Sequence, residues 1–568
     1  MGYSRSHAGR MTYLKTNRPT SVAAPSNGKT ISFAVLTVAC IFIFFGSATA
    51  GAESGLHAPY LIIHVDAVPS RLFFEEYDAG HLPNIKAVFD DGKLVRYAVS
   101  PFFAGTEMLY PRLKTGAGPD QPLPITWEMY DRNSGRHISR IETQVILFSH
   151  LPTYSLTQII HGIPGMDYLS GWALLNTPRL LDEYDIVEFF WFITDSYGHV
   201  FGEEAQRESL LILDEFLGIL MKQLGSKPVN LVIYADHGMS MFERTYDAES
   251  AMAETAGDNE QFVYYPNLYL KDRTLAATTA EQLANRDEID FAFYRADEFL
   301  IIGIHKEGQV MFRSEGNLIT YSCEGPDPFG YADLGCLGRP LSDQDWLEMT
   351  CTSRYPAVPV QIVRYMDNAL SGDIVAVLNP PKGLRTTVGF CGCHTGFVDT
   401  DCVVGVLMKG PDIDPSQIPD TFWLYEMYSQ VLKIDPQNPT KADRAKNFFM
   451  VSDGGIDLQL SAFRNNTALS IGPQEWTFIG ETTIARSFIT QVRAGLGLAS
   501  DKSLAGGLTP VASLRLDIYF GPLTYDHRNT IALTDGCRKS TSTLRFEAKN
   551  GVVLEWEYPN RIKLGVSW

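Results

Sequence analysis

Three uninterrupted apolar runs constrain the fold of this chain more than any other feature. They are LIIHVDAV (61–68), DIVEFFWFI (185–193) and VNLVIYAD (229–236). A strand that is apolar along its whole length is typical of a sheet covered on both faces. Between the second and third runs, the segment 202–224 places apolar residues at helical spacing. Strand, helix and strand in this order predict a βαβ unit and hence a mostly parallel sheet sandwiched by helices.

The pattern of apolar and polar residues divides the rest of the chain into two further regions. The segment 259–390 contains strand-like pieces such as FAFYRADEFLIIGIHKEG, which predict an inserted α+β region that covers the site. After about residue 441, short alternating runs separated by turn residues predict a small C-terminal β-rich domain. We therefore predict a catalytic domain over 53–440, with its insertion at about 259–390, and a C-terminal domain over 441–568.

Two interpretations of the C-terminal domain were weighed, an accessory module and an outer-membrane barrel. The runs are SLRLDIYFG (513–521), TLRFEAK (543–549) and VVLEWEY (552–558). Strands of an outer-membrane barrel need about 9–11 residues with an apolar, lipid-facing side. These runs are short and carry charges, so the sequence favours the accessory module.

The N-terminus predicts export. Residues 30–52 carry no charge, and the stretch before them contains basic residues but no acidic one. This pattern, followed by Ala48-Thr49-Ala50, predicts that residues 1–52 are a signal peptide, or alternatively a single membrane anchor. In both cases the catalytic domain lies outside the cytoplasm, in a periplasmic, extracellular or membrane-anchored form.

The net charge of the chain limits the classes of partner that the protein can bind. The net charge is −19, and an acidic surface excludes specific or nonspecific binding to a nucleic-acid backbone, which needs clustered Lys and Arg. A small phosphate-bearing substrate remains compatible with this charge, because bound divalent metals invert the local potential. The oligomeric state is left open by the sequence.

The cysteines predict some disulfide bonding in an exported protein. Seven of the eight lie outside the first fifty residues, so they cannot all pair within one chain. Cys323–Cys336 is the pair we favour. The C-x-C motif of Cys391 and Cys393 is only a weak indication of a zinc site, because no second pair accompanies it.

Acidic and histidine residues follow the predicted strands, at the edge of a parallel sheet where ligands gather. A carboxylate at the end of a buried strand needs a partner or a metal. A Thr after a Gly is free to present its hydroxyl at a turn. Taken singly each residue has an ordinary structural explanation, but together they offer ligands for two metals and one nucleophile. The set is Asp66, Thr106 after Gly105, Asp195-x-x-x-His199, the pair Asp236-His237, and His394 in FCGCHTGF (390–397).

In this order and spacing the residues resemble the alkaline phosphatase superfamily, in particular its nucleotide pyrophosphatase/phosphodiesterase branch. The resemblance covers about residues 59–435, and VVGVLMKGPDI (403–413) resembles the family's segment after the last His. The family places its Thr nucleophile nine residues before a Thr-Gly pair, and Thr106 precedes Thr115-Gly116 by nine. The resemblance implies that one metal is held by Asp66, Thr106, Asp236 and His237. It implies that the other is held by Asp195, His199 and His394.

The resemblance further implies a function. We expect hydrolysis of small phosphoesters with two divalent metal ions, Zn²⁺ or alternatively Mn²⁺, through a phosphothreonine at Thr106. A phosphodiesterase or nucleotide pyrophosphatase is favoured. The alternatives are a phosphomonoesterase of the same superfamily and a non-catalytic exported binding protein on this scaffold. A sulfatase is disfavoured, because Thr106-Glu107-Met108 does not match its C/S-x-P-x-R motif.

Two positions depart from the family pattern. The family continues Asp-Gly after the first strand, whereas this chain has Asp66-Ala67. More important, the family carries a phosphate-contacting Asn twelve residues after the Thr of the Thr-Gly pair, and Trp127 occupies this position. Arg112 or Lys114 could replace that donor, although the sequence slightly favours surface positions for both.

Overall fold

The computed structural model describes residues 58–150, 165–182, 184–385 and 389–436, and within 448–567 the strands of the C-terminal domain with part of their turns. The predicted signal peptide or anchor over 1–52, together with Cys40 and Cys537, lies outside the described residues. None of the helices in the described part of the chain combines the length and the apolar character needed to cross a bilayer.

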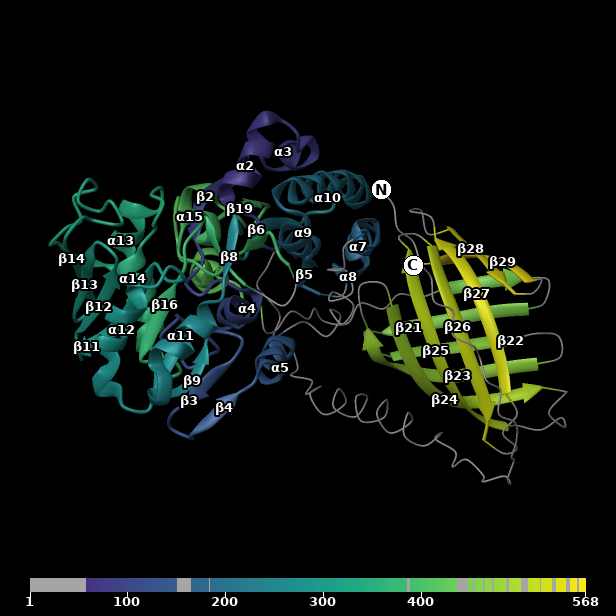
Figure 1. The fold of residues 1–568 in the computed structure, drawn as a ribbon. Coiled ribbons are helices and arrows are strands. Elements are labelled where there is room, and N and C mark those ends of the chain that lie inside the picture. The colour runs from purple at the N-terminus through teal and green to yellow at the C-terminus, as the bar shows by residue number, and fades with distance from the viewer. Residues whose placement is uncertain are drawn as a thin grey trace, which may run out of the picture. The chain divides into compact units, whose positions relative to one another are not determined.

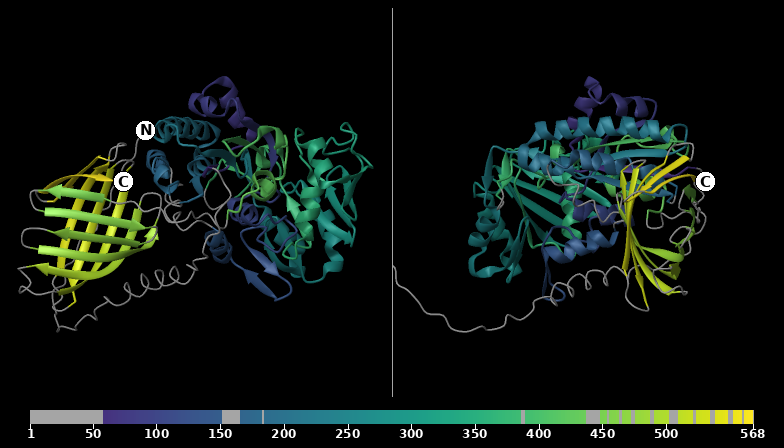
Figure 2. Two further views of the ribbon diagram at one scale, coloured as in Figure 1. Left: turned by 180° about the vertical axis from the view of Figure 1, so that it is seen from behind. Right: turned by 90° about the vertical axis from the view of Figure 1, so that its right-hand side faces the viewer.

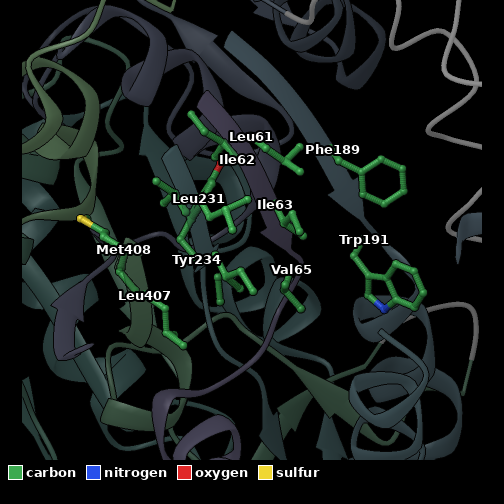
Figure 3. Close-up of a cluster of buried hydrophobic side chains, with 14 of the residues drawn as sticks. Leu61, Ile62, Ile63, Val65, Phe189, Trp191, Leu231, Tyr234, Leu407 and Met408 are labelled. Carbon is green, nitrogen blue, oxygen red and sulfur yellow. The ribbon is translucent and has the colours of Figure 1, made fainter. Parts of the chain in front are cut away.

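A five-stranded sheet forms the centre of the first domain, in the order β2-β19-β6-β1-β5 (Figure 1). β1 pairs in parallel with both β5 and β6, whereas β19 runs antiparallel to β6 and β2. The three apolar runs therefore form adjacent parallel strands, and the predicted mostly parallel sheet is confirmed. Figure 3 shows the buried side chains that these strands contribute to the core. The strands are β1 (Tyr60–Val65), β2 (Lys93–Val99), β5 (Ile186–Trp191), β6 (Asn230–Ala235) and β19 (Val403–Lys409).

Helices cover both faces of this sheet. Successive side chains of a strand point to opposite faces, and the strands β1, β5 and β6 are buried along their whole length. On one face, Trp191 donates its indole N–H to the Ser209 hydroxyl of α10 (Glu203–Leu224) at 2.9 Å. On the other face, the His64 ring stacks on Tyr110 of α4 (Thr106–Thr115). The predicted helix over 202–224 is thus confirmed as α10. The helices α2 (Ser70–Ala79) and α3 (Pro83–Phe89) also pack against β19.

A buried carboxylate links α4 to the sheet. Glu188 of β5 accepts a hydrogen bond from the Lys114 ammonium at 2.5 Å and from the Tyr428 hydroxyl at 2.7 Å, and a further one from the Tyr110 hydroxyl. Tyr428 belongs to η5 (Met427–Leu432). The expectation that Lys114 is a surface charge is therefore wrong. The sequence could not show that Glu188, inside an apolar strand, faces this helix.

The predicted insertion forms a second sheet of eight strands, in the order β15-β14-β13-β12-β11-β16-β10-β9. Its hydrophobic core includes Phe103 and Met108, which flank Thr106 in the sequence. The insertion therefore packs against the segment that begins α4. The strands are β9 (Glu260–Tyr264), β10 (Asn267–Leu270), β11 (Phe291–Asp297), β12 (Leu300–His305), β13 (Gly308–Glu315), β14 (Leu318–Glu324), β15 (Pro340–Ser342) and β16 (Ile374–Val377).

The favoured disulfide is absent. All six cysteines of the described residues, Cys323 and Cys336 among them, are free thiols. Cys323 lies in β14 opposite Val310 of β13, whereas Cys336 follows a turn and is buried in the core of the insertion. Their closeness in the sequence therefore does not bring their sulfur atoms together.

The C-terminal domain is a closed barrel of ten antiparallel strands, which Figure 2 shows from two further sides. The prediction of a β-rich domain is confirmed, but the strands are longer than the runs suggested. Three of them span 12 residues each. The strands are β20 (Phe448–Ser452), β21 (Gly455–Ala462), β22 (Asn465–Ile471), β23 (Glu475–Arg486), β24 (Thr490–Asp501), β25 (Thr509–Phe520), β26 (Leu523–Ala532), β27 (Arg538–Glu547), β28 (Val552–Glu557) and β29 (Arg561–Ser567).

The buried ion pair of the first domain yields a test of stability. Lys114→Met leaves the Glu188 carboxylate buried without its counter-charge, so we expect the free energy of unfolding in urea to fall by about 3 kcal/mol. The matched control is Lys409→Met, which breaks an exposed ion pair with Asp91 at 2.5 Å. Water solvates the carboxylate left there, so little change is expected. Equal effects of the two substitutions would contradict the role assigned to Lys114.

Candidate active site

The three parallel strands bring their carboxyl ends to one place. Val65 of β1 stands in register with Trp191 of β5 and Ala235 of β6. Asp66 and Asp236 follow the ends of β1 and β6 directly, and both are buried. Asp195 comes after β5, in the first turn of α9 (Ile193–Phe201). The register of the sheet therefore gathers the carboxylates of three segments that lie far apart in the sequence.

Thr106 is the first residue of α4 and lies against two of these carboxylates. Its hydroxyl donates to Asp236 Oδ2 at 2.9 Å and lies 3.4 Å from both oxygens of Asp66. Backbone N–H groups in the first turn of a helix have no partner within the helix and carry partial positive charge. Thr106 thus combines a nucleophilic oxygen with donors suited to an anionic substrate.

The Thr115-Gly116 pair marks the other end of the same helix. Gly116 ends α4 in the left-handed region with φ 69°, and the Thr115 hydroxyl donates to the Pro111 carbonyl oxygen at 2.8 Å. The nine-residue step of the motif therefore runs from the first to the last residue of α4. Thr115 takes no part in the site. Such a left-handed position favours glycine because it has no Cβ.

The three predicted histidines present the same ring nitrogen to the site. Each places Nδ1 2.7–2.9 Å from a backbone carbonyl oxygen. A carbonyl oxygen only accepts, so Nδ1 carries the proton and Nε2 keeps a lone pair for a metal. The pairs are His199 with Gly392, His237 with Gly238, and His394 with Ala104.

The side chains form two adjoining groups. In the first, Asp195 Oδ1 lies 3.2 Å from His199 Nε2 and 3.7 Å from His394 Nε2. In the second, His237 Nε2 lies 3.5 Å from Asp66 Oδ1 and 3.4 Å from Asp236 Oδ2. The structure thus brings together all seven residues predicted from the sequence. Cys391 and Cys393 belong to neither group; the Cys391 thiol donates to backbone carbonyl oxygens, and the Cys393 thiol donates to the hydroxyl of Thr395.

The electrostatics of these groups fit a divalent cation. Burial raises the pKa of Asp66 well above its ordinary value, and the neighbouring Asp236 and Asp195 carboxylates raise it further. Burial acts in the same direction on Asp236, but His237 and His64 outweigh it and hold its pKa low. Burial, with His237 and His199 nearby, lowers the pKa of His394 to about 3, so this ring is neutral. Clustered carboxylates beside neutral imidazoles are a donor set suited to Zn²⁺ or Mn²⁺.

His64 belongs to the site, although the sequence interpretation missed it. This buried residue of β1 places Nε2 3.2 Å from Asp236 Oδ1. A signal was present in the sequence, because residues two apart on a strand share a face, and His64 precedes Asp66 by two. A histidine in an otherwise apolar strand, in phase with a carboxylate, predicts such a contact.

Trp127 occupies the border of the site. Its ring packs edge-on against Phe103 and against His394, with centroids 5.2 and 6.1 Å apart. The indole Nε1 is buried and has no hydrogen-bond partner among the described residues. A buried donor of this kind is rare in proteins and calls for an external acceptor.

Arg112 binds the loop that leads to Trp127 and does not enter the site. Its guanidinium is buried and donates to the carbonyl oxygens of Leu123 and Pro124 at 3.2 Å and to that of Gly118. Burial lowers the pKa of Arg112 to about 10. The expected surface position of Arg112 is wrong, because the loop that leads to Trp127 folds over the guanidinium and uses its donors.

Comparisons with known proteins agree with this geometry in part. Solved structures that are similar to this chain include two ectonucleotide pyrophosphatases/phosphodiesterases and an alkaline phosphatase. Murine and human ectonucleotide pyrophosphatase/phosphodiesterase 5 each share 14% identity at a TM-score of 0.40, covering 66% of this chain and 95% of theirs. The alkaline phosphatase PafA shares 11% identity at a TM-score of 0.45, covering 68% of this chain and 98% of its own. Among curated protein sequences, none matches this chain.

The family comparison bears on the site itself. Residues 165–292 match the model of the type I phosphodiesterase / nucleotide pyrophosphatase family. The matched segment contains β5, α9, α10 and β6, and with them four of the seven predicted site residues, Asp195, His199, Asp236 and His237. This segment is therefore similar to the type I phosphodiesterase / nucleotide pyrophosphatase family.

Proposed function

We propose that the chain hydrolyses small phosphodiesters or pyrophosphates with Thr106 as nucleophile and two divalent metal ions. The observation that carries this proposal is the position of the Thr106 hydroxyl, 2.9 Å from Asp236 at the N-terminal end of α4. The Nε2 atoms of three histidines converge on the same place. One ion is assigned to Asp66, Thr106, Asp236 and His237, and the other to Asp195, His199 and His394.

The residues of the chain have distinct tasks in this reaction. When bound, two divalent ions lower the pKa of a coordinated hydroxyl and neutralise the charge that develops on the phosphoryl group. Asp236 orients the Thr106 hydroxyl, whose oxygen attacks phosphorus while the bond to the leaving oxygen breaks. The backbone N–H groups of the first turn of α4 donate to the phosphoryl oxygens. Water then attacks the phosphothreonine, releases phosphate or a phosphomonoester and restores the hydroxyl.

Trp127 replaces the amide donor of the family in this proposal. Its buried indole N–H, beside His394 and without a partner in the described part of the chain, is a donor for a substrate oxygen. An indole donates once and accepts nothing, unlike an amide side chain. This arrangement suits a phosphoryl oxygen that carries no proton.

Monoester hydrolysis is the second candidate within the superfamily, because the exchange of Asn for Trp127 removes the usual indication for diesters. A panel of aryl phosphate monoesters and diesters, with Zn²⁺ or Mn²⁺, separates the two candidates. We expect a roughly tenfold or larger preference for diesters in kcat/KM, equivalent to about 1.4 kcal/mol. The reverse preference would assign the monoester reaction.

The metal assignment predicts a stoichiometry. Full-length chain stripped of metal and titrated with Zn²⁺ in a calorimeter is expected to bind two ions. His199→Ala and His237→Ala should each lower the number to one, because each removes a ligand from a different group. The control is His81→Ala, whose side chain is 62% exposed and pairs with Glu76. Absence of any Zn²⁺ binding would instead favour a non-catalytic binding protein.

The nucleophile assignment predicts a contrast between two substitutions. Thr106→Ala removes the hydroxyl and should lower kcat by roughly a thousandfold or more. Thr106→Ser keeps a hydroxyl and should retain most of the activity. Zn²⁺ titration of both variants checks that the metals remain bound. Unchanged turnover in Thr106→Ala with two metals present contradicts the mechanism.

The role of Trp127 predicts a specific loss. Trp127→Phe keeps an aromatic ring against Phe103 but removes the N–H, so kcat should fall by about a hundredfold. The matched control is Trp423→Phe, since Trp423 also has a buried indole nitrogen without a partner among the described residues, and it packs in the core of the insertion. Equal kcat values for wild type and Trp127→Phe would show that the indole donates nothing to the substrate.

A further inference from the structure

The wall of the C-terminal barrel has two chemically different sides. Along β25, Ser513, Arg515 and Asp517 are buried, whereas the intervening Leu514 is 51% exposed. Successive side chains of a strand point to opposite faces, so one set fills the inside of the closed barrel and the other forms its outer surface. Along this part of β25, polar residues lie inside and an apolar residue lies outside, which is the reverse of a water-soluble barrel.

Inside the barrel, charged groups pair along a strand and across neighbouring strands. Arg515 contacts Asp517 at 2.7 Å and Asp526 of β26 at 3.4 Å. Arg545 of β27 contacts Glu555 of β28 at 2.7 Å. The charges that made the sequence look unsuited to a lipid-facing strand are therefore neutralised on the inner side.

Outside the barrel, the large described side chains are apolar on five consecutive strands or the turns after them. The outer face of β26 also carries His527 and Asn529, which hydrogen-bond to Ser542 and Ser540 of β27. The large apolar ones have exposed fractions between 36% and 68%. None of the exposed barrel residues in the described part of the chain is Asp, Glu, Lys or Arg. Monomeric soluble proteins rarely expose a contiguous apolar surface of this kind. The large side chains are Leu496, Leu514, Leu533, Leu544, Phe546, Leu554, Trp556 and Tyr558.

The same phase continues around the barrel in the strand register. Leu554 of β28 is opposite Leu564 of β29, and Leu458 of β21 is opposite Leu469 of β22. Apolar residues thus occupy outer register positions on both sides of the closure between β20 and β29, whereas β26 places the polar His527 and Asn529 at such positions. A second protein would cover one patch of such a surface, whereas a bilayer surrounds all of it.

Five consecutive strands of the barrel, β23 to β27, are long enough to cross a bilayer, whereas the other five span 5 to 8 residues. β24 and β25 span 12 residues each, and β26 and β27 span 10 each. A transmembrane strand needs about 9–11 residues to cross the hydrocarbon layer at the usual tilt. The closed hydrogen bonding also leaves no strand edge, which hydrocarbon could not solvate.

We propose that the C-terminal barrel is embedded in a lipid bilayer, with its outer apolar side chains in contact with the hydrocarbon chains. This proposal is independent of the reaction assigned to Thr106. It replaces the accessory module favoured by the sequence and makes the chain an integral membrane protein.

Insertion of the full-length chain into vesicles tests the proposal. The chain, folded in dodecylphosphocholine micelles, is diluted into dilauroylphosphatidylcholine vesicles, which are then floated on a density gradient and washed with alkaline carbonate. We expect the protein to remain with the vesicles. Leu514→Arg, midway along β25, should lower the inserted fraction at least about tenfold, because a charge at mid-depth is poorly tolerated.

Two matched variants distinguish the effect of a charge at mid-depth in the bilayer from the effect of a larger side chain and from the effect of a charge near the interface. Leu514→Phe keeps an apolar group at mid-depth and should insert like wild type. Leu533→Arg lies just beyond the end of β26 and should insert within about twofold, since charges near the interface cost little. Retained heat-dependent gel mobility in micelles shows that each variant folds.

The opposite results overturn the proposal. An unmodified chain that stays monodisperse in buffer without detergent, or that carbonate releases from vesicles, has its outer surface in water or only at the membrane surface. Under an aqueous surface, Leu514→Arg would replace an exposed Leu by a solvated charge and would be tolerated. The result for the unmodified chain decides the question even if a variant fails to fold.

Discussion

The gathering of three carboxylates, two of them buried, at one edge of a parallel sheet is the constraint on which the site depends. Asp66 and Asp236 end neighbouring strands in register, so they must lie close together wherever the sheet forms. Their mutual repulsion appears in the raised pKa of Asp66, to which burial contributes most. His237 and His64 offset it only around Asp236. The remaining excess of negative charge favours positive charge at this point and explains how an acidic protein can attract a phosphoester.

The position of Thr106 depends on a second buried charge at the far end of the same helix. α4 begins with Thr106, and Lys114, near its C-terminal end, pairs with Glu188 of β5. Glu188 also accepts hydrogen bonds from two tyrosine hydroxyls, one of them on η5. Because β5 also leads into α9 and Asp195, this pair fixes Thr106, the proposed nucleophile, relative to the strand that leads to Asp195, a proposed metal ligand. The helix acts as a rigid spacer between the two.

The sequence predicted the central sheet well, because an apolar run with no polar interruption has few other structures open to it. It also predicted the gathering of Asp66, Asp195 and Asp236, since parallel strands bring their carboxyl ends to one edge. It failed for Arg112 and Lys114, whose burial depends on partners distant in the sequence. His64 was not predicted because only residues at strand ends were considered as ligands. Its position two residues before Asp66 nevertheless indicates that both side chains lie on the same face of β1. The prediction of a Cys323–Cys336 disulfide was wrong because closeness along the chain does not fix the direction of a side chain.

The barrel shows why alternation alone did not decide the last domain. A strand such as SLRLDIYFG places Leu and Ile on one face and Arg and Asp on the other, whichever side faces water. The accessory module was predicted because the runs are short and carry charges, which are unsuited to a lipid-facing strand. Ten strands that close on themselves leave an interior that Arg515 and Asp517 fill as ion pairs, and they turn Leu514 and its neighbours outward. Closure is a property of all ten strands together, so no single segment could reveal it. It places the charged face of a strand such as β25 inside the barrel and the apolar face outside.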